Sequence, residues 1–157
     1  MILCYVLVAI SGLGLFQIGL NHYFDFFITN RISFDLIVSI IFIAAQTLVM
    51  FFFVGTGVNI REYLEEHPEL GENLYKRMFA IKRRLYPPTM MVTMLFMAMV
   101  IVDGVFYFGK ISEWWFHILY FLTLYYFYKA TKEQHASFKG STRIVLEMTE
   151  KERQSIS

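Results

Sequence analysis

The chain has 157 residues, of which 57% are hydrophobic, 18% are aromatic and only 17% are charged, and its mean hydropathy is +0.50. A soluble domain of this length carries more charge and fewer apolar residues, so the composition excludes an ordinary soluble fold and predicts an integral membrane protein. The formal net charge of +1 offers no overall positive field for nucleic acid. The single cysteine, Cys4, excludes an intramolecular disulfide and paired-cysteine metal motifs.

Four long apolar runs follow one another along the chain. Each approaches the ~20 residues that a helix needs to cross a hydrocarbon layer of ~30 Å, although the fourth is shorter and has aromatic residues at both ends. The runs are continuous rather than alternating, which favours transmembrane helices over the strands of a β-barrel. We therefore predict an all-α fold with a membrane domain of residues 1–130 and four spans, at about 2–20, 36–54, 89–108 and 114–128.

The basic residues are divided unequally among the connections between these runs. Six lie between the second and third runs and six follow the fourth, whereas the other two connections contain only Arg31 and Lys110. Because loops rich in Lys and Arg remain in the cytoplasm, we expect both termini and the polar segment 58–86 to be cytoplasmic. The short connections 21–35 and 109–113 then face outward, and the expected location is the cytoplasmic (inner) membrane of a bacterium or archaeon.

The cytoplasmic segment 58–86 has two competing interpretations. It could be an amphipathic helix on an anionic membrane surface, where its basic side chains contact lipid headgroups. Alternatively, the second and third helices continue beyond the membrane and turn near His67 and Pro68 as a helical hairpin. We favour the hairpin, in which the glutamates of the first arm face the basic second arm. The glutamates are Glu62, Glu65, Glu66 and Glu69, the basic residues are Lys76, Arg77, Lys82, Arg83 and Arg84, and the apolar stripe of the second arm is Leu70, Leu74, Met78, Ile81 and Leu85.

Two further expectations concern breaks in these helices. Pro87 and Pro88 should kink the third helix or restart it at the membrane surface, because proline removes a helical hydrogen bond and clashes with the preceding turn. The cytoplasmic tail, residues 131–157, begins with helix-forming sequence. We predict that residues 140–142, Gly-Ser-Thr, interrupt this helix and that the remainder forms a short helix or strand on a partner.

Ionisable side chains gather at the predicted outer ends of all four helices. His22 and Asp25 follow the first run, Asp35 opens the second, Asp103 lies near the end of the third and His117 lies near the start of the fourth. The expected orientation places these residues in one layer of the membrane. An ionisable residue at such a depth is costly and normally faces protein or water, so this layer is the candidate site.

Three chemistries and one structural interpretation fit the layer. Imidazole and carboxylate groups suit divalent zinc or copper, and the candidate ligands are His22, Asp25, Asp103 and His117. His22 and His117 could instead be axial ligands of a b-type haem, or Asp103 and His117 could form a pair that relays protons or contacts a quinone. The plainest alternative is a structural hydrogen bond from a Tyr, Trp or His to Asp103, with no resident cofactor, and we favour it.

The remaining polar motifs predict helix packing. The segment 55–57, Gly-Thr-Gly, follows an apolar helix and lacks the third glycine of a dinucleotide fingerprint, so it predicts close helix contact rather than phosphate binding. Gln17, Gln46 and Thr47 are the remaining polar groups within the first two runs, and they predict interhelical hydrogen bonds.

The sequence contains no hydrolytic triad, no glycosidase-type carboxylate pair and no phosphate loop, so we do not expect a self-contained enzyme. Our first hypothesis is an accessory or scaffold subunit that stabilises a larger membrane complex, with other membrane subunits and lipids as partners and no nucleic acid. The second is a small redox or metal-binding subunit, with haem b, copper or zinc, that uses the outward layer. The third is a small channel or carrier built from oligomers.

Overall fold

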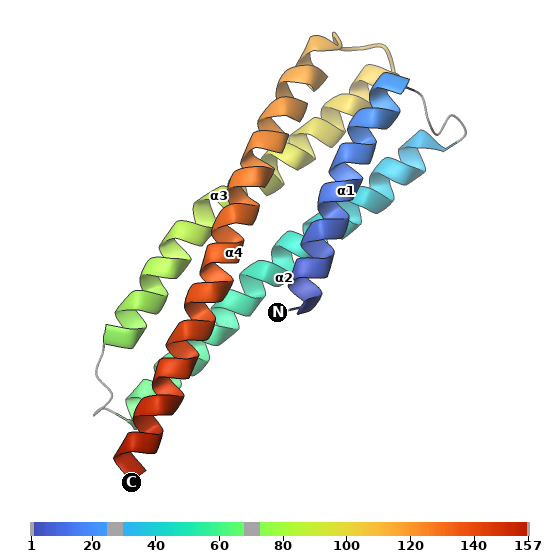
Figure 1. Ribbon diagram of the computed structural model, residues 1–157. Helices are drawn as coiled ribbons and strands as arrows, with labels where there is room; N and C mark the ends of the chain where they lie inside the picture. Colours follow the sequence, from blue (N-terminus) through green and yellow to red (C-terminus); the bar gives the residue numbers. More distant parts are fainter. Residues whose placement is uncertain (1, 25–29, 68–72, 157) are drawn as a thin grey trace.

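The computed structural model describes residues 2–24, 30–67 and 73–156, which form four helices in chain order (Figure 1). No strand is present in these described ranges, and this confirms the all-α prediction. The helices are α1 (Ile2–Phe24), α2 (Arg31–Glu66), α3 (Asn73–Tyr107) and α4 (Trp114–Ile156).

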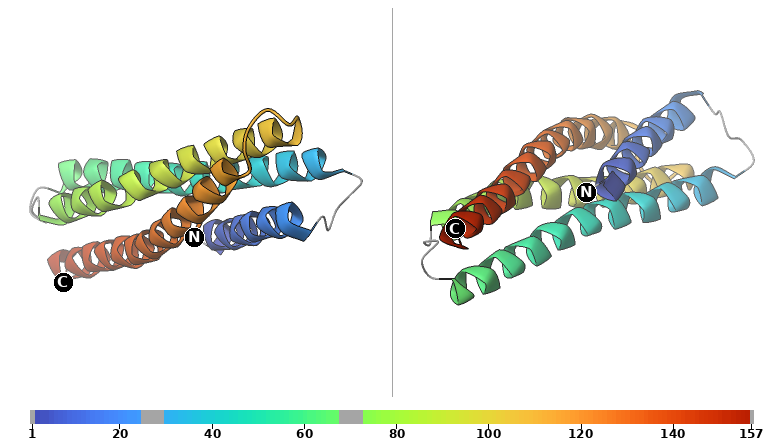
Figure 2. Two further views of the ribbon diagram at one scale, coloured as in Figure 1. Left: turned by 90° about the horizontal axis from the view of Figure 1, so that it is seen from above. Right: turned by 60° about the horizontal axis from the view of Figure 1, so that its bottom comes forward.

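The helices form an elongated bundle in which neighbours along the chain run antiparallel (Figures 1 and 2). α2, α3 and α4 contain 36, 35 and 43 residues, so each is more than about 50 Å long, whereas the 23 residues of α1 reach only about 35 Å. α1 therefore covers only one half of the bundle. We call the end of the bundle where α1 ends the site end, and the helical part beyond the start of α1 (58–67, 73–84 and 139–156) the stalk.

Three helices are long and apolar enough to cross a membrane: α1, α2 from Ile32 onwards, and α3. This finding confirms that the chain is of the membrane class. The surfaces that these helices turn away from the bundle are also apolar, and Leu13, Phe51 and Met94 are each more than two-thirds exposed. Such exposure suits contact with lipid and is unusual in water. A crossing by residues 114–128 of α4 stays a prediction.

Two buried apolar clusters join the helices. Near the site end, α2 and α3 meet through Phe42 and Phe96, whose rings stack with their centroids 3.9 Å apart. Towards the stalk, Phe53 of α2 and Phe138 of α4 pack together with centroids 5.1 Å apart, and Cys4 of α1 is buried in the same cluster. Buried apolar side chains, including packed aromatic rings, therefore join the helices in both halves of the bundle.

Segment 58–86 is divided between the end of α2 and the start of α3, as the hairpin favoured from the sequence requires, and residues 68–72 between these two arms lie outside the described residues. The apolar stripe predicted for its second arm faces the interior. Leu74, Met78 and Leu85 are at most 2% exposed and belong to the cluster near the stalk, while Leu70 lies outside the described residues. Burial of this stripe explains why the arm stays in the bundle instead of lying on a membrane surface.

Two ion pairs formed by described residues of the hairpin join partners other than those expected. Arg77 of the second arm forms a bidentate pair with Glu147 of α4, and Glu65 of the first arm pairs with Arg61 one turn earlier in α2. Arg77 thus ties the second arm to α4, the helix with which α3 forms the most extensive contact of the bundle. Glu69, also expected to face the basic arm, lies outside the described residues.

The break predicted at residues 140–142 is wrong, because α4 passes through them as one continuous helix. Gly140 lies against α3, where a Cβ atom added to it would come within 2.9 Å of Ile81 Cδ1. Its neighbours Ser141 and Ile144 are buried. Burial of this face outweighs the ~1 kcal/mol that a glycine costs in a helix interior.

α3 likewise contains Pro87 and Pro88 within one continuous helix, so the predicted restart at the membrane surface does not occur. The two prolines leave the carbonyl groups of Arg83 and Arg84 without their usual helical donors. Both arginines are exposed, so these carbonyl groups can be solvated, and the helix continues.

Candidate functional site

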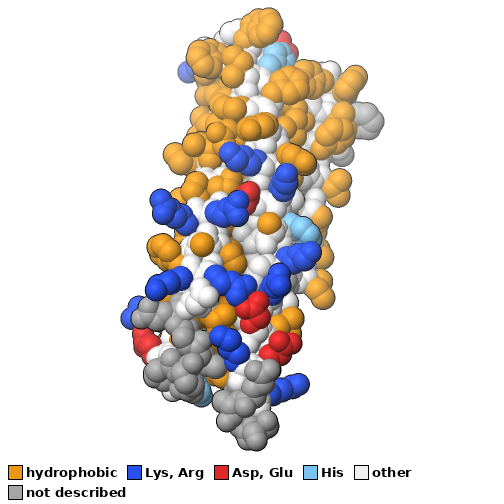
Figure 3. Space-filling model, turned by 60° about the vertical axis from the view of Figure 1, so that its left-hand side comes forward, with side chains coloured by type: hydrophobic (Ala, Val, Ile, Leu, Met, Phe, Trp, Pro, Cys, Tyr) orange, Lys and Arg blue, Asp and Glu red, His pale blue; other side chains and the backbone are white. Residues whose placement is uncertain are grey.

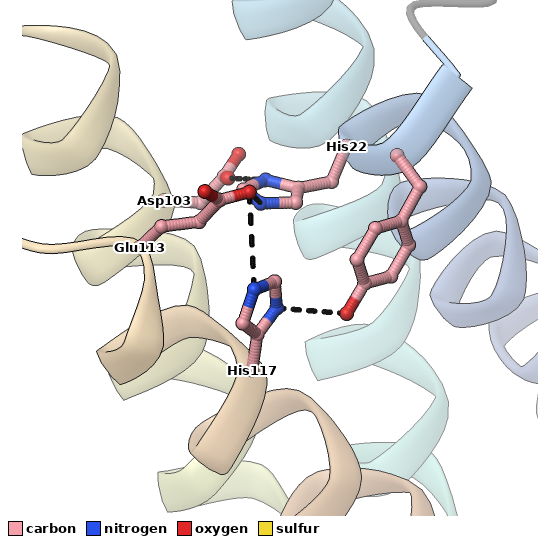
Figure 4. Close-up of polar contacts among 5 residues, drawn as sticks. His22, Asp103, Glu113 and His117 are labelled. Atoms are coloured by element: carbon pink, nitrogen blue, oxygen red, sulfur yellow. Dashed lines mark hydrogen bonds and ion pairs between the residues drawn. The ribbon is translucent and has the colours of Figure 1, made fainter.

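Ionisable side chains from α1, α3 and α4 come together at the site end (Figure 4). His22 and Tyr23 belong to the last turn of α1, and Asp103 to the end of α3. Glu113 precedes the first residue of α4, and His117 follows in its first turn. Successive contacts join them in the order Asp103, His22, Glu113, His117 and Tyr23. We call this set the ionisable series.

The contact between His22 and Asp103 is the most buried of the series. His22 Nδ1 lies 2.8 Å from Asp103 Oδ1, and the two side chains are 1% and 6% exposed. α1 and α3 lie diagonally across the bundle, each packed on α2 and α4, so the imidazole reaches through the interior to its partner. The ring of Phe116 stacks on this imidazole with centroids 3.7 Å apart and shields one of its faces from water.

This pairing sets the hydrogen-bonding role of each nitrogen of His22. With an ionised Asp103, the Nδ1–H group donates to the carboxylate, which leaves Nε2 directed towards the end of the bundle. Nε2 lies 3.6 Å from Glu113 Oε1. That distance is within ion-pair range but longer than a hydrogen bond.

Glu113 is an exposed member of the series, with its side chain 54% exposed. It lies next to the N-terminus of α4, where the helix dipole favours a negative charge, and its carbonyl oxygen accepts from the backbone amide of His117. The same carboxylate oxygen that faces His22 lies 3.8 Å from His117 Nε2. Glu113 is therefore placed between two imidazoles.

His117 completes the series through Tyr23. The Tyr23 hydroxyl lies 2.8 Å from His117 Nδ1, and the two rings stack with centroids 5.4 Å apart. With Nε2–H directed at Glu113, Nδ1 accepts the hydrogen bond that the tyrosine donates. The last turn of α1 is thus bound to the first turn of α4.

Asp103 borders a pocket as well as the bundle interior. The pocket has a volume of about 120 Å³ and lies between α2 and α3, with Asp35 of α2 and Tyr107 of α3 among its lining residues. Most of the other lining side chains are apolar. The ionisable series therefore leads from the exposed Glu113, through the buried His22, to the buried Asp103. Asp103 shares its pocket with Asp35.

The structure brings most of the predicted layer to one end of the bundle but pairs its members differently. His22, Asp35, Asp103 and His117 all lie at the site end, whereas Asp25 lies outside the described residues. Asp103 contacts His22 instead of His117. The depth of each residue follows from its position along the helix, but the direction of a side chain depends on how each helix is rotated against its neighbours.

Two members of the series were missed by the sequence analysis. Glu113 precedes His117 by four residues, a spacing that places both on one helical face. Tyr23 follows His22 directly and could have been found as the hydrogen-bonding hydroxyl at the outer end of the first apolar run. Neither spacing is specific, and only the arrangement of helices shows that they share a site.

Within the described ranges 2–24, 30–67 and 73–156, no group of three or more His, Cys, Asp or Glu side chains is arranged to hold a metal ion. The imidazoles of His22 and His117 lie at 87° to each other with centroids 5.9 Å apart. Glu113 contacts both rings and Phe116 covers one of them. The two imidazoles therefore do not face each other across a flat slot of the kind that a porphyrin occupies.

The chain matches no protein-family model, and neither a curated protein nor a solved structure is significantly similar to it.

Proposed function

We propose that this chain is a non-catalytic accessory subunit of a larger membrane assembly, which it stabilises through helix packing and through its stalk. The observation that carries this proposal is the pattern of exposed apolar side chains on the stalk. Phe79 and Leu146 are both 58% exposed although they lie in the charged half of the bundle, beyond the apolar ends of the spans. Exposed apolar groups in such a setting are typical of contacts with another protein.

The distribution of charge supports a cytoplasmic stalk. On the face shown in Figure 3, apolar side chains dominate the half near the site end, and Lys and Arg side chains gather over the other half. Basic segments next to membrane spans remain in the cytoplasm. We therefore place the stalk and both termini in the cytoplasm and the site end outside, in the inner membrane of a bacterium or archaeon.

The packing of α4 supports a fourth crossing. α4 runs antiparallel to α3 (Figure 1), and the contact between these two helices is more extensive than that between any other pair of helices. Since α3 is apolar enough to span, the first part of α4 lies at the same depth as the end of α3. Residues 114–128 then form the fourth span, and Trp114 with Trp115 lies at the outer interface.

Native electrophoresis after mild-detergent extraction tests the proposed assembly. We expect the tagged chain to co-migrate with other membrane subunits and Phe79→Glu to abolish this co-migration, because a charge replaces an apolar contact. Ala80→Glu is the matched control, since Ala80 is the exposed neighbour on the same helix and should leave co-migration unchanged. A chain that migrates only by itself would overturn the proposal.

The ionisable series favours a second candidate function, a small subunit that handles protons within a redox or transport assembly. An ionisable residue buried inside a membrane bundle is a functional candidate by default. Here His22 connects the exposed Glu113 with the buried Asp103. Imidazole exchanges protons near neutral pH, so the series provides a path from the outer solution to Asp103.

Infrared spectroscopy of the chain in nanodiscs tests this path. After a rapid drop in pH, we expect a protonated-carboxyl band that Asp103→Asn removes and that His22→Leu delays. Glu62→Gln, an exposed substitution on the stalk, is the control and should change neither. A band that forms equally fast in His22→Leu would exclude His22 as the connection.

Absorbance and elemental analysis separate this candidate from the haem and metal hypotheses. We expect purified chain without a Soret band and with less than one equivalent of zinc, copper or iron. A Soret band that His22→Leu and His117→Leu both remove would instead establish haem ligation.

A further inference from the structure

The side chain of Lys82 crosses from α3 to α2 at the point where the two helices leave the apolar half of the bundle. It lies against Gly57, where a Cβ atom added to the glycine would collide with Lys82 Nζ. Lys82 is half-buried in this position, and the next residue, Arg83, is exposed. We call these two residues the basic pair.

The basic pair has no acidic partner in the part of the chain that the structure describes. Neither residue forms a hydrogen bond or an ion pair there. The sequence of α3 contains no Asp or Glu before Asp103, and α2 contains none between Asp35 and Glu62. Burial lowers the pKa of the Lys82 amine below its ordinary value of 10.5, and no described carboxylate offsets this effect. The pair is therefore a local positive site that an external anion would neutralise.

The basic pair lies at the depth of lipid headgroups. Lys82 precedes Tyr107, the last residue of α3, by 25 residues, and Gly57 follows Ile32 of α2 by the same number. Ile32 and Tyr107 line one pocket at the site end, and 25 residues correspond to about 37 Å along each helix. A bilayer has a hydrocarbon layer of ~30 Å and measures about 40–45 Å with its headgroups. With the site end at one surface, Lys82 lies among the headgroups of the opposite leaflet.

An apolar groove between α2 and α3 ends close to the basic pair. Its volume is about 450 Å³, and none of its lining side chains among the described residues is charged. Thr89 and Met90 line the groove on α3, and the basic pair precedes them by seven residues, or about two helical turns on the same face. On α2, Gly57 follows the lining residue Met50 by the same spacing. The groove therefore continues, at the headgroup level, into the space between Gly57 and the basic pair.

We infer that the basic pair binds the phosphate group of an anionic phospholipid whose acyl chain lies in the groove between α2 and α3. Ammonium and guanidinium groups both donate strong hydrogen bonds to phosphate oxygens, and basic pockets between membrane helices suit anionic headgroups.

A zwitterionic lipid fits less well, because its headgroup adds a cation and no described carboxylate lies beside the basic pair to receive it. An acidic protein segment fits less well because its polar backbone would find few partners in the apolar groove. The inference requires that α2 and α3 cross the membrane, for which both are long and apolar enough. It is independent of the assembly proposed above.

Photolabelling in phosphatidylcholine nanodiscs tests the site with two trace lipids that carry the same diazirine acyl chain, a phosphatidylglycerol and a phosphatidylcholine. We expect the phosphatidylglycerol to label the groove residues of α2 and α3 and the phosphatidylcholine to label them much less. Lys82→Gln combined with Arg83→Gln should reduce labelling by phosphatidylglycerol about thirtyfold, the effect of losing two contacts with an anionic headgroup.

Lys132→Gln combined with Lys139→Gln is the matched control. It removes the same charge from exposed positions of α4, outside the groove, and should leave the labelling unchanged. Both double variants should keep the melting temperature of the wild type. An equal loss of labelling in the control would show a general attraction of lipid to the basic surface and would overturn the inference.

Gly57→Ala provides a further variant that keeps both charges. The added methyl group displaces only the flexible end of the Lys82 side chain, so it should lower labelling by phosphatidylglycerol without lowering the melting temperature. Equal labelling by the two lipids, or equal labelling of wild type and the double variant of the basic pair, would overturn the inference. Cross-links from the groove to a second copy or to an acidic partner protein in place of lipid would also overturn it.

Discussion

The site end and the stalk each contain an acidic side chain that contacts a nitrogen-bearing side chain, but in contrasting surroundings. His22 and Asp103 pair inside the bundle with almost no exposure, whereas Arg77 and Glu147 pair at the surface with their side chains 42% and 31% exposed. A buried pair is costly to form and strongly destabilising to break, while an exposed pair contributes little because water and salt screen it. Burial of an ionisable pair at the site end carries a desolvation cost that the exposed pair of the stalk does not, and this difference marks the site end as the candidate for function.

The two ends also differ in what holds them together. Stacked rings and hydrogen-bonded imidazoles join the helices at the site end. In the stalk, α3 packs through Leu74 and Met78, and the ion pairs lie at its margin. The stalk therefore combines an apolar interior with a surface that carries ion pairs.

The largest expected effect tests the prediction that the two ends lie on opposite sides of the membrane. In a Cys4→Ser background, we expect an impermeant maleimide to label Ser112→Cys from outside intact cells and Thr149→Cys only after the cells are opened. Both positions are exposed in the structure. Labelling of both from one side would show that α4 does not cross, and the reverse pattern would invert the topology.

Breaking the buried pair should produce the largest loss of stability. Asp103→Leu removes the acceptor of His22 Nδ1 inside the bundle and should lower the free energy of unfolding by about 3–5 kcal/mol. Unfolding in mixed detergent micelles measures this change. Asp103→Asn keeps an acceptor oxygen and should cost less, and Glu62→Leu, the same kind of change at an exposed stalk position, should have little effect. Equal stability of wild type and Asp103→Leu would place the pair outside the interior.

The apolar interior of the stalk gives the next largest effect. Met78 is fully buried, and Met78→Ala should destabilise the chain by about 2–5 kcal/mol through loss of apolar contacts and formation of a cavity. The neighbouring Phe79 is exposed, so Phe79→Ala should leave the unfolding transition nearly unchanged. If both variants unfolded alike, the orientation assigned to this part of α3 would be wrong.

The smallest effect is the pH dependence of the stalk ion pair. The hydrogen bond from Arg77 lowers the pKa of Glu147 below its ordinary value of 4.5. Because the folded-state pKa is the lower one, the stabilisation is complete above the ordinary value and is lost as the pH falls through the folded-state value. Wild type should therefore be slightly more stable than Glu147→Gln at neutral pH, and the two should converge in acid. High salt should reduce the difference, and a difference that persists in acid would contradict this assignment.

Much of the fold could be predicted because the length and the apolar pattern of each run are local properties of the sequence. The apolar runs predicted the helices, and the stripe that includes Leu74, Met78 and Leu85 predicted the second arm of the hairpin. The break at residues 140–142 was mispredicted because the continuity of the helix there depends on a tertiary contact. Gly140 has a poor intrinsic helix propensity, and only its close approach to Ile81 shows why the helix continues.

The candidate site also divides into features that local sequence determines and features that tertiary packing determines. The sequence by itself determined the membrane class, the helices and the gathering of His22, Asp103 and His117 at one end, because depth along a helix is set by residue number at a fixed rise. The tertiary structure alone decided that Asp103 meets His22, that Tyr23 meets His117 and that Gln46 borders a groove. The physical reason is that the direction of a side chain depends on the rotation of its helix, and that rotation is chosen by the packing of all four helices together.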